Sequence, residues 1–292
     1  MTRLALGTWA FGGNFGFWAD QKRKDSLKTI HQAVRSGVLE FDTASAYANG
    51  QSEQLLGQQL KRFPLERSSL FISTKTMSLQ DVKKSLHRLC MTYVDLLYLH
   101  WPNSKKDCHP ILDGMRKVEG IRNIGICNVN QAYLQTLEDI PLSYIQIPCT
   151  LLWTRGLKEL KEYCKGKGIK LSGYSPVGMG ILSGRHNTPP KDSRSTLYCY
   201  KAPKELQALL AYLQELSLTK KCSQSQIAIA WALAQGFDQL VIGARTKEQL
   251  LQDLQSGKII LHESELTQLD MLSETLQKTA PSEQDNLFGH RW

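Results

Sequence analysis

Residues 39–57, LEFDTASAYANGQSEQLLG, place a carboxylate and a phenol directly after a short apolar run. Asp42 ends the run, Tyr47 follows it, and a helix-like pattern resumes a few residues later. Two further polar residues end other apolar runs, Lys75 in FISTK and His100 in DLLYLHWP. Each has an ordinary explanation when taken alone, because strand-end Asp residues often cap, Lys is usually solvated, and a lone His is usually a hydrogen-bonded rim residue.

Together these four side chains are suited to protonating an oxygen atom. A free tyrosine has a pKa of about 10 and keeps its proton at neutral pH. A nearby ammonium favours the phenolate, so Lys75 is expected to make Tyr47 a better proton donor, while Asp42 keeps Lys75 charged. An imidazole at His100 would orient a carbonyl oxygen or help to relay the proton. The group predicts a site that protonates an oxyanion as it forms.

Other reactions fit these residues poorly. The sequence shows no nucleophile beside a base, and no second carboxylate pairs with Asp42 as glycoside hydrolysis requires. Hydride is the natural candidate for the component that attacks the carbonyl carbon, and because no side chain donates hydride, a nicotinamide cofactor is implied. No GxGxxG follows a strand, which argues against a Rossmann-type site.

Apolar, β-branched runs that alternate with helix-like stretches are expected to position these residues. Strands are expected at residues 3–9, 38–42, 70–75, 94–100, 121–127, 144–148, 169–175 and 239–243. Helices are expected at 24–36, 51–62, 79–90, 110–118, 130–139, 156–166, 204–217, 224–235 and 247–255, with one more after 261. Eight strand-plus-helix units predict an α/β fold, a (β/α)8 TIM barrel with an added C-terminal helix. An open doubly wound sheet is the alternative. Residues at the carboxyl ends of barrel strands meet at one rim, so the four polar residues are expected to converge.

Composition narrows the class of protein. The chain has 292 residues, of which 41% are hydrophobic, and this favours a single domain over residues 1–292. Seven cysteines without a CxxC pair, in a chain without a signal-like start, predict reduced thiols in the cytoplasm. A metal site at Cys108 and His109 is conceivable, but two adjacent residues do not make one, and no metal is expected.

The charge pattern indicates few macromolecular partners. A formal charge of +9 raises the possibility of an acidic partner, but the basic residues are scattered and are not interleaved with aromatics. Neither nucleic acid nor a membrane is therefore expected as a partner, and no apolar run approaches the roughly 20 residues of a membrane helix. The expected partner is a small-molecule carbonyl substrate.

Seven segments, in this order, resemble the aldo-keto reductases: GTWAFGG (7–13), FDTASAYANGQSEQLLG (41–57), STK (73–75), YVDLLYLHWP (93–102), IRNIGICN (121–128), YSPVGMGILSG (174–184) and VIGARTKEQLLQDL (241–254). That family is a (β/α)8 barrel that reduces aldehydes and ketones with NAD(P)H. Its Asp, Tyr, Lys and His tetrad falls here on Asp42, Tyr47, Lys75 and His100. Some family members instead serve as accessory subunits of potassium channels, so a cofactor-binding regulatory or sensor protein stays open as the alternative function.

The resemblance also implies contacts with the cofactor. Asn128 and Gln146 match the pair that holds the nicotinamide carboxamide, and Tyr174 matches the aromatic residue that stacks on the ring. The loop from Ser175 to Arg185 matches the one that surrounds the pyrophosphate. The remaining expected cofactor residues are Thr8, Trp9, Asp42, Pro176, Gly180, Ser183, Gly243, Arg245, Gln249 and Asp253. The residues expected to line the substrate are Trp9, Tyr47, His100 and Trp101, and the tail aromatics Phe288 and Trp292 suggest an apolar mouth.

Two residues of opposite charge are expected at the adenosine end of the cofactor. A guanidinium suits a 2′-phosphate, so Arg245 favours NADPH over NADH, whereas Asp253 brings a negative charge to the same end. Asp253 stands where the family usually has asparagine, and Cys127 stands where it usually has serine. Thr246 and Gln249 have the spacing of a helix cap, and three glycines near 180 are compatible with an ordinary turn. NADPH is the expected cofactor, with NADH possible.

Overall fold

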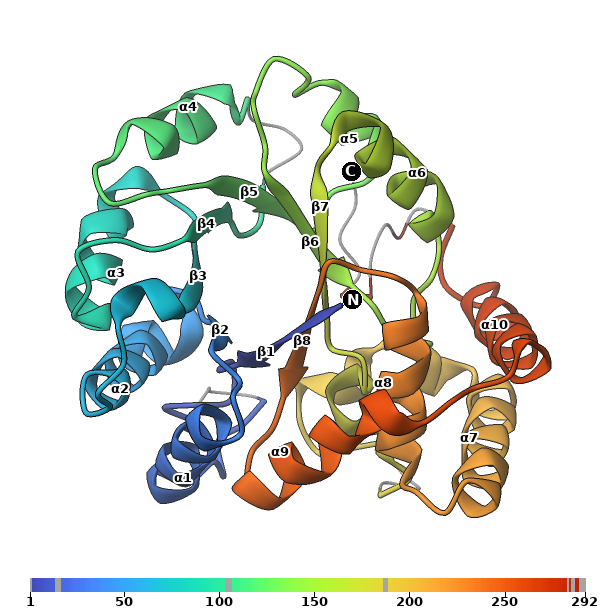
Figure 1. The fold of residues 1–292 in the computed structure, drawn as a ribbon. Coiled ribbons are helices and arrows are strands. Elements are labelled where there is room, and N and C mark those ends of the chain that lie inside the picture. Colours follow the sequence, from blue (N-terminus) through green and yellow to red (C-terminus); the bar gives the residue numbers. More distant parts are fainter. Residues whose placement is uncertain are drawn as a thin grey trace.

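A closed barrel forms the centre of the molecule (Figure 1). The computed structural model describes residues 2–13, 17–102, 107–185, 189–282, 284 and 287–288. Within these residues, eight parallel strands pair in sequence order. They are β1 (Arg3–Gly7), β2 (Glu40–Asp42), β3 (Phe71–Thr76), β4 (Leu96–Leu99), β5 (Ile124–Cys127), β6 (Tyr144–Pro148), β7 (Lys170–Tyr174) and β8 (Gln239–Gly243). Because β8 pairs in parallel with β1, the barrel is confirmed and the open sheet is wrong.

Helices surround the barrel on its outside (Figure 1). They are α1 (Arg23–Arg35), α2 (Gln51–Leu60), α3 (Val82–Leu89), α4 (His109–Lys117), α5 (Gln131–Gln135), α6 (Leu157–Lys167), α7 (Pro203–Thr219), α8 (Gln224–Ala234) and α9 (Lys247–Leu254). The added helix expected after residue 261 is α10 (Glu263–Gln277), which packs on α7. Several strands are shorter than the runs predicted for them: β2 begins at Glu40 rather than at residue 38, and β5 begins at Ile124 rather than at residue 121.

The spacing of Ser78 with Asp81 and of Ser223 with Gln226 predicts two helix caps, and the structure confirms one of them. At α8, Ser223 Oγ accepts from the Gln226 backbone N–H at 3.3 Å, and Gln226 Oε1 accepts from the Ser223 N–H at 3.0 Å. This reciprocal pair completes a capping box. Ser78 instead donates to the Asp81 carboxylate at 3.1 Å, and a 3-10 turn (Leu79–Asp81) precedes α3. Spacing alone therefore located both helices, but only Ser223 caps in the expected way.

Side chains alternate between the two faces of each strand. In β4, Leu97 and Leu99 belong to the main hydrophobic core between strands and helices. Leu96 and Tyr98 instead form a second apolar cluster with residues of β5 and β6. The period of two in extended chain produces this division, and it also directs alternate polar residues into the barrel.

Polar side chains form a hydrogen-bonded series inside the barrel, which we call the lumen chain. Gln239 Nε2 donates to Glu40 at 2.6 Å, and Ser172 Oγ donates to Gln239 Oε1 at 2.8 Å. Gln146 Nε2 then contacts Ser172 Oγ at 3.3 Å and donates to Asp42 at 2.9 Å. The chain starts and ends on β2 and passes through β8, β7 and β6. It joins the far end of the barrel interior to the rim that carries Asp42.

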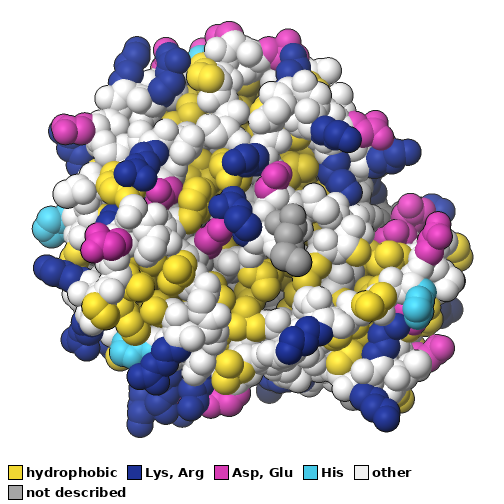
Figure 2. Space-filling view, viewed as in Figure 1, with side chains coloured by type: hydrophobic (Ala, Val, Ile, Leu, Met, Phe, Trp, Pro, Cys, Tyr) yellow, Lys and Arg dark blue, Asp and Glu magenta, His cyan; other side chains and the backbone are white. Residues whose placement is uncertain are grey.

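The surface carries its positive charge in a dispersed form. Lys and Arg side chains are spread over the face seen in Figure 2, with acidic side chains between them and the densest group over α1. In the described part of the chain, no helix combines the length and apolar character needed to cross a membrane. The described residues also contain no group of three or more His, Cys, Asp or Glu side chains that could hold a metal ion.

Candidate active site

Lys75 forms hydrogen bonds with two of the other three residues predicted to carry the chemistry, Asp42 and Tyr47. It lies in β3 and is almost fully buried, and its Nζ donates to Asp42 Oδ1, to the Thr43 carbonyl at 2.9 Å and to the Tyr47 hydroxyl at 3.2 Å. These three acceptors use all three ammonium protons. The structure therefore brings Asp42, Lys75 and Tyr47 together at one rim of the barrel, as the sequence predicts.

Asp42 is the buried counter-ion of Lys75. Its second carboxylate oxygen accepts hydrogen bonds from Ser73 Oγ and from Gln146 Nε2, both at 2.9 Å. Burial alone would lower the pKa of Lys75, but Asp42, followed by Tyr47, raises it above its ordinary value. Lys75 is consequently an ammonium throughout the neutral range, and the carboxylate that holds it is itself fully hydrogen-bonded.

A left-handed turn sets the position of Tyr47. Ala48, Asn49 and Gly50 have φ values of 47°, 53° and 85°, and α2 begins at the next residue. For residues with a Cβ this conformation costs on the order of 1 kcal/mol or more, and such strain is often found at functional sites. The turn leaves the Tyr47 ring facing Lys75 and His100, whose ring centroid is 5.7 Å away.

The pKa of Tyr47 is raised, although the nearby Lys75 charge taken alone would lower it. Burial raises the pKa of Tyr47 to about 12, and the Lys75 charge opposes this shift without overcoming it. The effect of Lys75 has the predicted sign, but desolvation of the phenolate is larger. Tyr47 therefore keeps its proton throughout the neutral range, which suits a donor that protonates an oxyanion.

His100 is a neutral imidazole whose ring packs against the ring of Tyr47. Burial, and secondarily the Lys75 charge, lowers its pKa well below the usual value. Its Nδ1 is buried and has no hydrogen-bond partner among the described residues. Its backbone carbonyl accepts from Asn128 Nδ2 at 3.2 Å. The ring lines the same cavity as the Tyr47 hydroxyl, so both can approach one oxygen atom.

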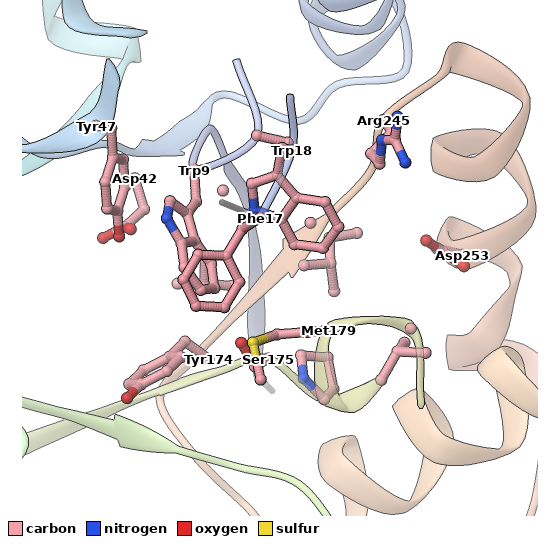
Figure 3. Close-up of a pocket in the computed structure, with 18 of the residues that line it drawn as sticks. Trp9, Phe17, Trp18, Asp42, Tyr47, Tyr174, Ser175, Met179, Arg245 and Asp253 are labelled. Carbon is pink, nitrogen blue, oxygen red and sulfur yellow. The ribbon is translucent and has the colours of Figure 1, made fainter. Parts of the chain in front are cut away.

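A cavity of about 740 Å³ extends from the tetrad to α9. Tyr47 and Asp42 lie at one end and Arg245 and Asp253 at the other, with the aromatic residues Trp9, Phe17 and Trp18 between them (Figure 3). Ligand pockets of this kind commonly measure 300–1,000 Å³. The volume and elongated lining are compatible with a dinucleotide together with a small substrate.

Nearly all predicted cofactor and substrate residues line this cavity. Besides the tetrad, they are Trp9, Trp101, Asn128, Gln146, Tyr174, Ser175, Pro176, Gly180, Ser183, Arg185, Gly243, Arg245, Gln249 and Asp253. Thr8 is the exception, because it is fully buried and is not among the residues that line the cavity. Its hydroxyl donates to the Asp42 carbonyl at 3.1 Å and accepts from Ser52 at 2.8 Å. Thr8 thus supports the strand that carries Asp42.

The hydrogen bonds of Asn128 and Gln146 leave one unused donor on Asn128 and one weakly used acceptor on Gln146. Asn128 accepts from the Tyr174 hydroxyl at 2.6 Å and uses one amide proton on the His100 carbonyl, so one proton remains. Gln146 uses its NH₂ on Asp42 and Ser172, and its oxygen receives only a weak contact from the Cys127 thiol at 3.8 Å. One donor and one acceptor match the two groups of a carboxamide. Cys127 therefore contacts the side chain of Gln146 and is not among the residues that line the cavity.

The apolar mouth predicted near the tetrad is present in part. Phe288 lies with its ring centroid 5.8 Å from Trp101 and 6.3 Å from both Trp9 and Tyr174. Phe288 therefore lines the tetrad end of the cavity. Trp292, the other tail aromatic, lies outside the described residues.

Residues of the β1–α1 loop were missed by sequence reasoning. The Arg245 guanidinium pairs with Asp20 at 2.7 Å and donates to Gln21 at 2.9 Å. The Trp18 ring lies 5.7 Å from Arg245 and 4.9 Å from Arg194, two residues separated by about fifty positions in the chain. The aromatic pair at residues 17–18 was the available signal, but its position over the cavity depends on barrel closure.

Comparisons with known proteins agree with this geometry. A model described as the Aldo/keto reductase family matches residues 3–274. The NADH-specific methylglyoxal reductase of Escherichia coli (strain K12) is 28% identical, over 95% of this chain and 96% of that protein. The aldo-keto reductase YhdN of Bacillus subtilis (strain 168) is 29% identical, over 85% of this chain and 83% of that protein. A glycerol dehydrogenase structure from Gluconobacter oxydans superimposes with a TM-score of 0.81 at 26% identity, covering 96% of this chain and 93% of that one.

Proposed function

This chain belongs to the aldo/keto reductase family, and on that premise we propose that it reduces aldehydes or ketones to alcohols, with Tyr47 as the proton donor and a nicotinamide dinucleotide as the reductant. The observation that carries the proposal is the 3.2 Å contact between Lys75 Nζ and the Tyr47 oxygen at the end of the large cavity. The comparisons give no support to the alternative of a regulatory or sensor protein.

The proposed chemistry divides the work among the tetrad. Because the Tyr47 oxygen accepts from Lys75, its own proton is free to point into the cavity toward a carbonyl oxygen. Neutral His100 orients that oxygen from a second side, since imidazole can donate one N–H. Asp42 keeps Lys75 charged and in place. The bound dinucleotide supplies the hydride that no side chain can provide.

The remaining cavity residues are proposed to hold the dinucleotide. Asn128 and Gln146 offer a donor and an acceptor to the carboxamide, and Tyr174 offers a ring face. We propose that Arg185 and the loop that precedes it hold the pyrophosphate. Arg245 and Gln249, next to the start of α9, are proposed to hold the adenosine end, because helix N-termini favour anions.

We propose NADPH as the preferred cofactor, with Arg245 as the residue that recognises the 2′-phosphate. Asp20 competes for the same guanidinium, but its side chain is 76% exposed. An exposed ion pair contributes about 0–1 kcal/mol, whereas hydrogen bonds to a charged phosphate contribute about 1.5–3 kcal/mol. The phosphate is therefore expected to displace Asp20. The location in the cytoplasm and the single domain over 1–292 stay predictions.

The decisive test is turnover. Purified protein is mixed with NADPH and an aromatic aldehyde, with methylglyoxal as a second substrate because the Escherichia coli relative is named for it. Loss of absorbance from the reduced nicotinamide, dependent on both substrate and Tyr47, supports the proposal. Tight cofactor binding without turnover on any carbonyl of a broad panel would instead favour a regulatory protein.

A further inference from the structure

Asp253 is unlike the other buried carboxylates of this chain. Among the described residues, four acidic side chains are buried: Asp42, Glu53, Asp95 and Asp253. Asp42 pairs with Lys75, Glu53 with Arg88, and Asp95 with Arg67 and Arg122. Asp253 is 6% exposed, and no described residue forms a hydrogen bond or an ion pair with its carboxylate. A buried charge without such partners is costly.

The Asp253 side chain extends from α9 toward the cavity (Figure 3). It therefore lines the end that lies farthest from Tyr47, beside Arg245. That end also contains Gln249 and Gln252, which carry no charge. A ligand that fills the cavity would cover Asp253 and remove its remaining contact with water.

The charged groups around Asp253 give it little compensation. Across the cavity, Arg185 acts on the carboxyl from a distance, while Arg245 is already paired with Asp20 and Arg194 with Asp192. The packed helix α8 contains no titratable residue. The other elements packed against α9 are α1, whose charged residues are Arg23, Lys24, Asp25, Lys28, His31 and Arg35, and the turn that carries Lys258. Burial, opposed by Arg185, raises the pKa of Asp253 to about 7.

We propose that Asp253 binds the adenosine end of the cofactor as a protonated carboxyl, so that cofactor binding takes up one proton and weakens as the pH rises above neutrality. The inference rests on the proposed function and concerns the same cavity. The proton comes from solvent and forms an O–H bond on Asp253, and no other bond changes. Asp253 is thus a residue that couples cofactor affinity to pH.

The hydrogen-bonding pattern of a purine explains why the protonated form is preferred. The adenine edge presents an amino donor next to a ring-nitrogen acceptor. A protonated carboxyl presents one donor and one acceptor, as an amide does, whereas a carboxylate presents acceptors only. A carboxylate would also be repelled by the negatively charged phosphates of a bound dinucleotide, and such repulsion is stronger at low dielectric than in water. Both effects favour uptake of the proton.

The test measures NADH affinity against pH by fluorescence titration from pH 6 to 9. NADH is the probe because it lacks the 2′-phosphate, which itself titrates near pH 6. For the parent we expect a Kd about 10–25-fold higher at pH 8.5 than at pH 6.5, since binding linked to one proton changes by up to tenfold per pH unit above the pKa of the free protein, which is about 7. Asp253→Asn keeps the shape and one donor, and its Kd is expected to change by less than about twofold over this range.

Calorimetry provides a second readout. At pH 8, NADH binding to the parent in two buffers of different ionisation enthalpy should show uptake of a proton, while Asp253→Asn shows none. Asp113→Asn, an exchange on exposed α4, is the matched control and should behave as the parent does. A Kd independent of pH in the parent, or an equal dependence in Asp253→Asn, overturns the inference. Failure of the parent to bind NADH or NADPH at any pH contradicts the proposed function instead.

Discussion

The Tyr47 hydroxyl oxygen lies 3.2 Å from Lys75 Nζ, and the same nitrogen donates to Asp42. A phenol that accepts a hydrogen bond from an ammonium has its own proton free for another acceptor. That acceptor can only come from the cavity side, where the ring is partly exposed. The relationship makes Tyr47 a donor aimed at a ligand.

Tyr47→Phe is expected to lower turnover by roughly 10²–10⁴-fold, the usual range for loss of a general acid. Cofactor affinity should stay near that of the parent, because the ring is kept. Steady-state reduction of an aldehyde and a fluorescence titration measure the two effects separately. Tyr163→Phe, on the surface helix α6, controls for loss of a hydroxyl elsewhere. Parent-like turnover in Tyr47→Phe would show that the proton comes from another group.

Lys75→Met is expected to abolish the reaction or to raise further the pKa that controls it, because the phenolate loses the ammonium that favours it. The single change also leaves Asp42 buried without a counter-ion, at a cost of about 3–5 kcal/mol. The double variant Lys75→Met with Asp42→Asn should recover much of the stability and none of the activity. Thermal melts and pH–rate profiles distinguish these effects. A single variant that oxidises the alcohol at the parent's rate across pH 6–9 would exclude Lys75 from its role, because that direction needs the phenolate.

The two directions of the reaction should depend differently on pH at saturating cofactor. Reduction needs protonated Tyr47, and with a pKa of about 12 this form is present throughout pH 6–9. Oxidation of the alcohol needs the phenolate, whose fraction rises about tenfold per pH unit below the pKa. Neutral His100 adds no ionisation near its usual pKa. Rates of the chemical step, from rapid mixing, should thus be flat for reduction and rise for oxidation. A fall in the reductive rate near pH 7 would contradict this assignment.

Arg245→Ala is expected to cost about 1.5–3 kcal/mol in NADPH binding and to leave NADH nearly unchanged. Asp20→Asn should act in the opposite direction, because it removes the competitor for the guanidinium. Its gain in NADPH affinity should stay below about fivefold, the limit set by an exposed ion pair. Fluorescence titration of NADPH and NADH against the parent and each variant measures these changes in affinity. Equal losses for NADPH and NADH in Arg245→Ala, or a parent that prefers NADH, would remove Arg245 from this role.

Asp253→Asn is expected to stabilise the cofactor-free protein at alkaline pH. The folded-state pKa of Asp253 is raised from 3.8 to about 7, so the folded state holds a proton that the unfolded state releases. Parental stability therefore falls as pH rises from about 4 to 7, by up to about 4 kcal/mol, and stays low above that range. The Tm difference between variant and parent should accordingly grow from pH 5 to pH 8. A constant difference would show that Asp253 is ionised with little cost.

The sequence was sufficient for the barrel and for the tetrad because both depend on local patterns. Strand ends are visible as apolar runs that stop at a polar residue, and closure of eight strands brings Asp42, Lys75 and Tyr47 to one rim. Desolvation is a property of the assembled cavity, so the raised pKa of Tyr47 was not predictable from its neighbours in sequence. The pairing of Asp20 with Arg245 crosses more than two hundred residues and appears only when β1 lies beside β8.

The hydrogen bonds of the lumen chain favour one register of the barrel strands. Apolar side chains tolerate a two-residue slip between strands, because one Leu or Val can replace another at the same face. The hydrogen bonds from Glu40 through Gln239, Ser172 and Gln146 to Asp42 are satisfied in one alignment of β2, β6, β7 and β8. A slipped barrel would bury several of these groups without partners, which is costly. Assembly of the correct sheet and orientation of the Asp42 carboxylate are therefore a single event, and a mis-registered barrel has no competent site.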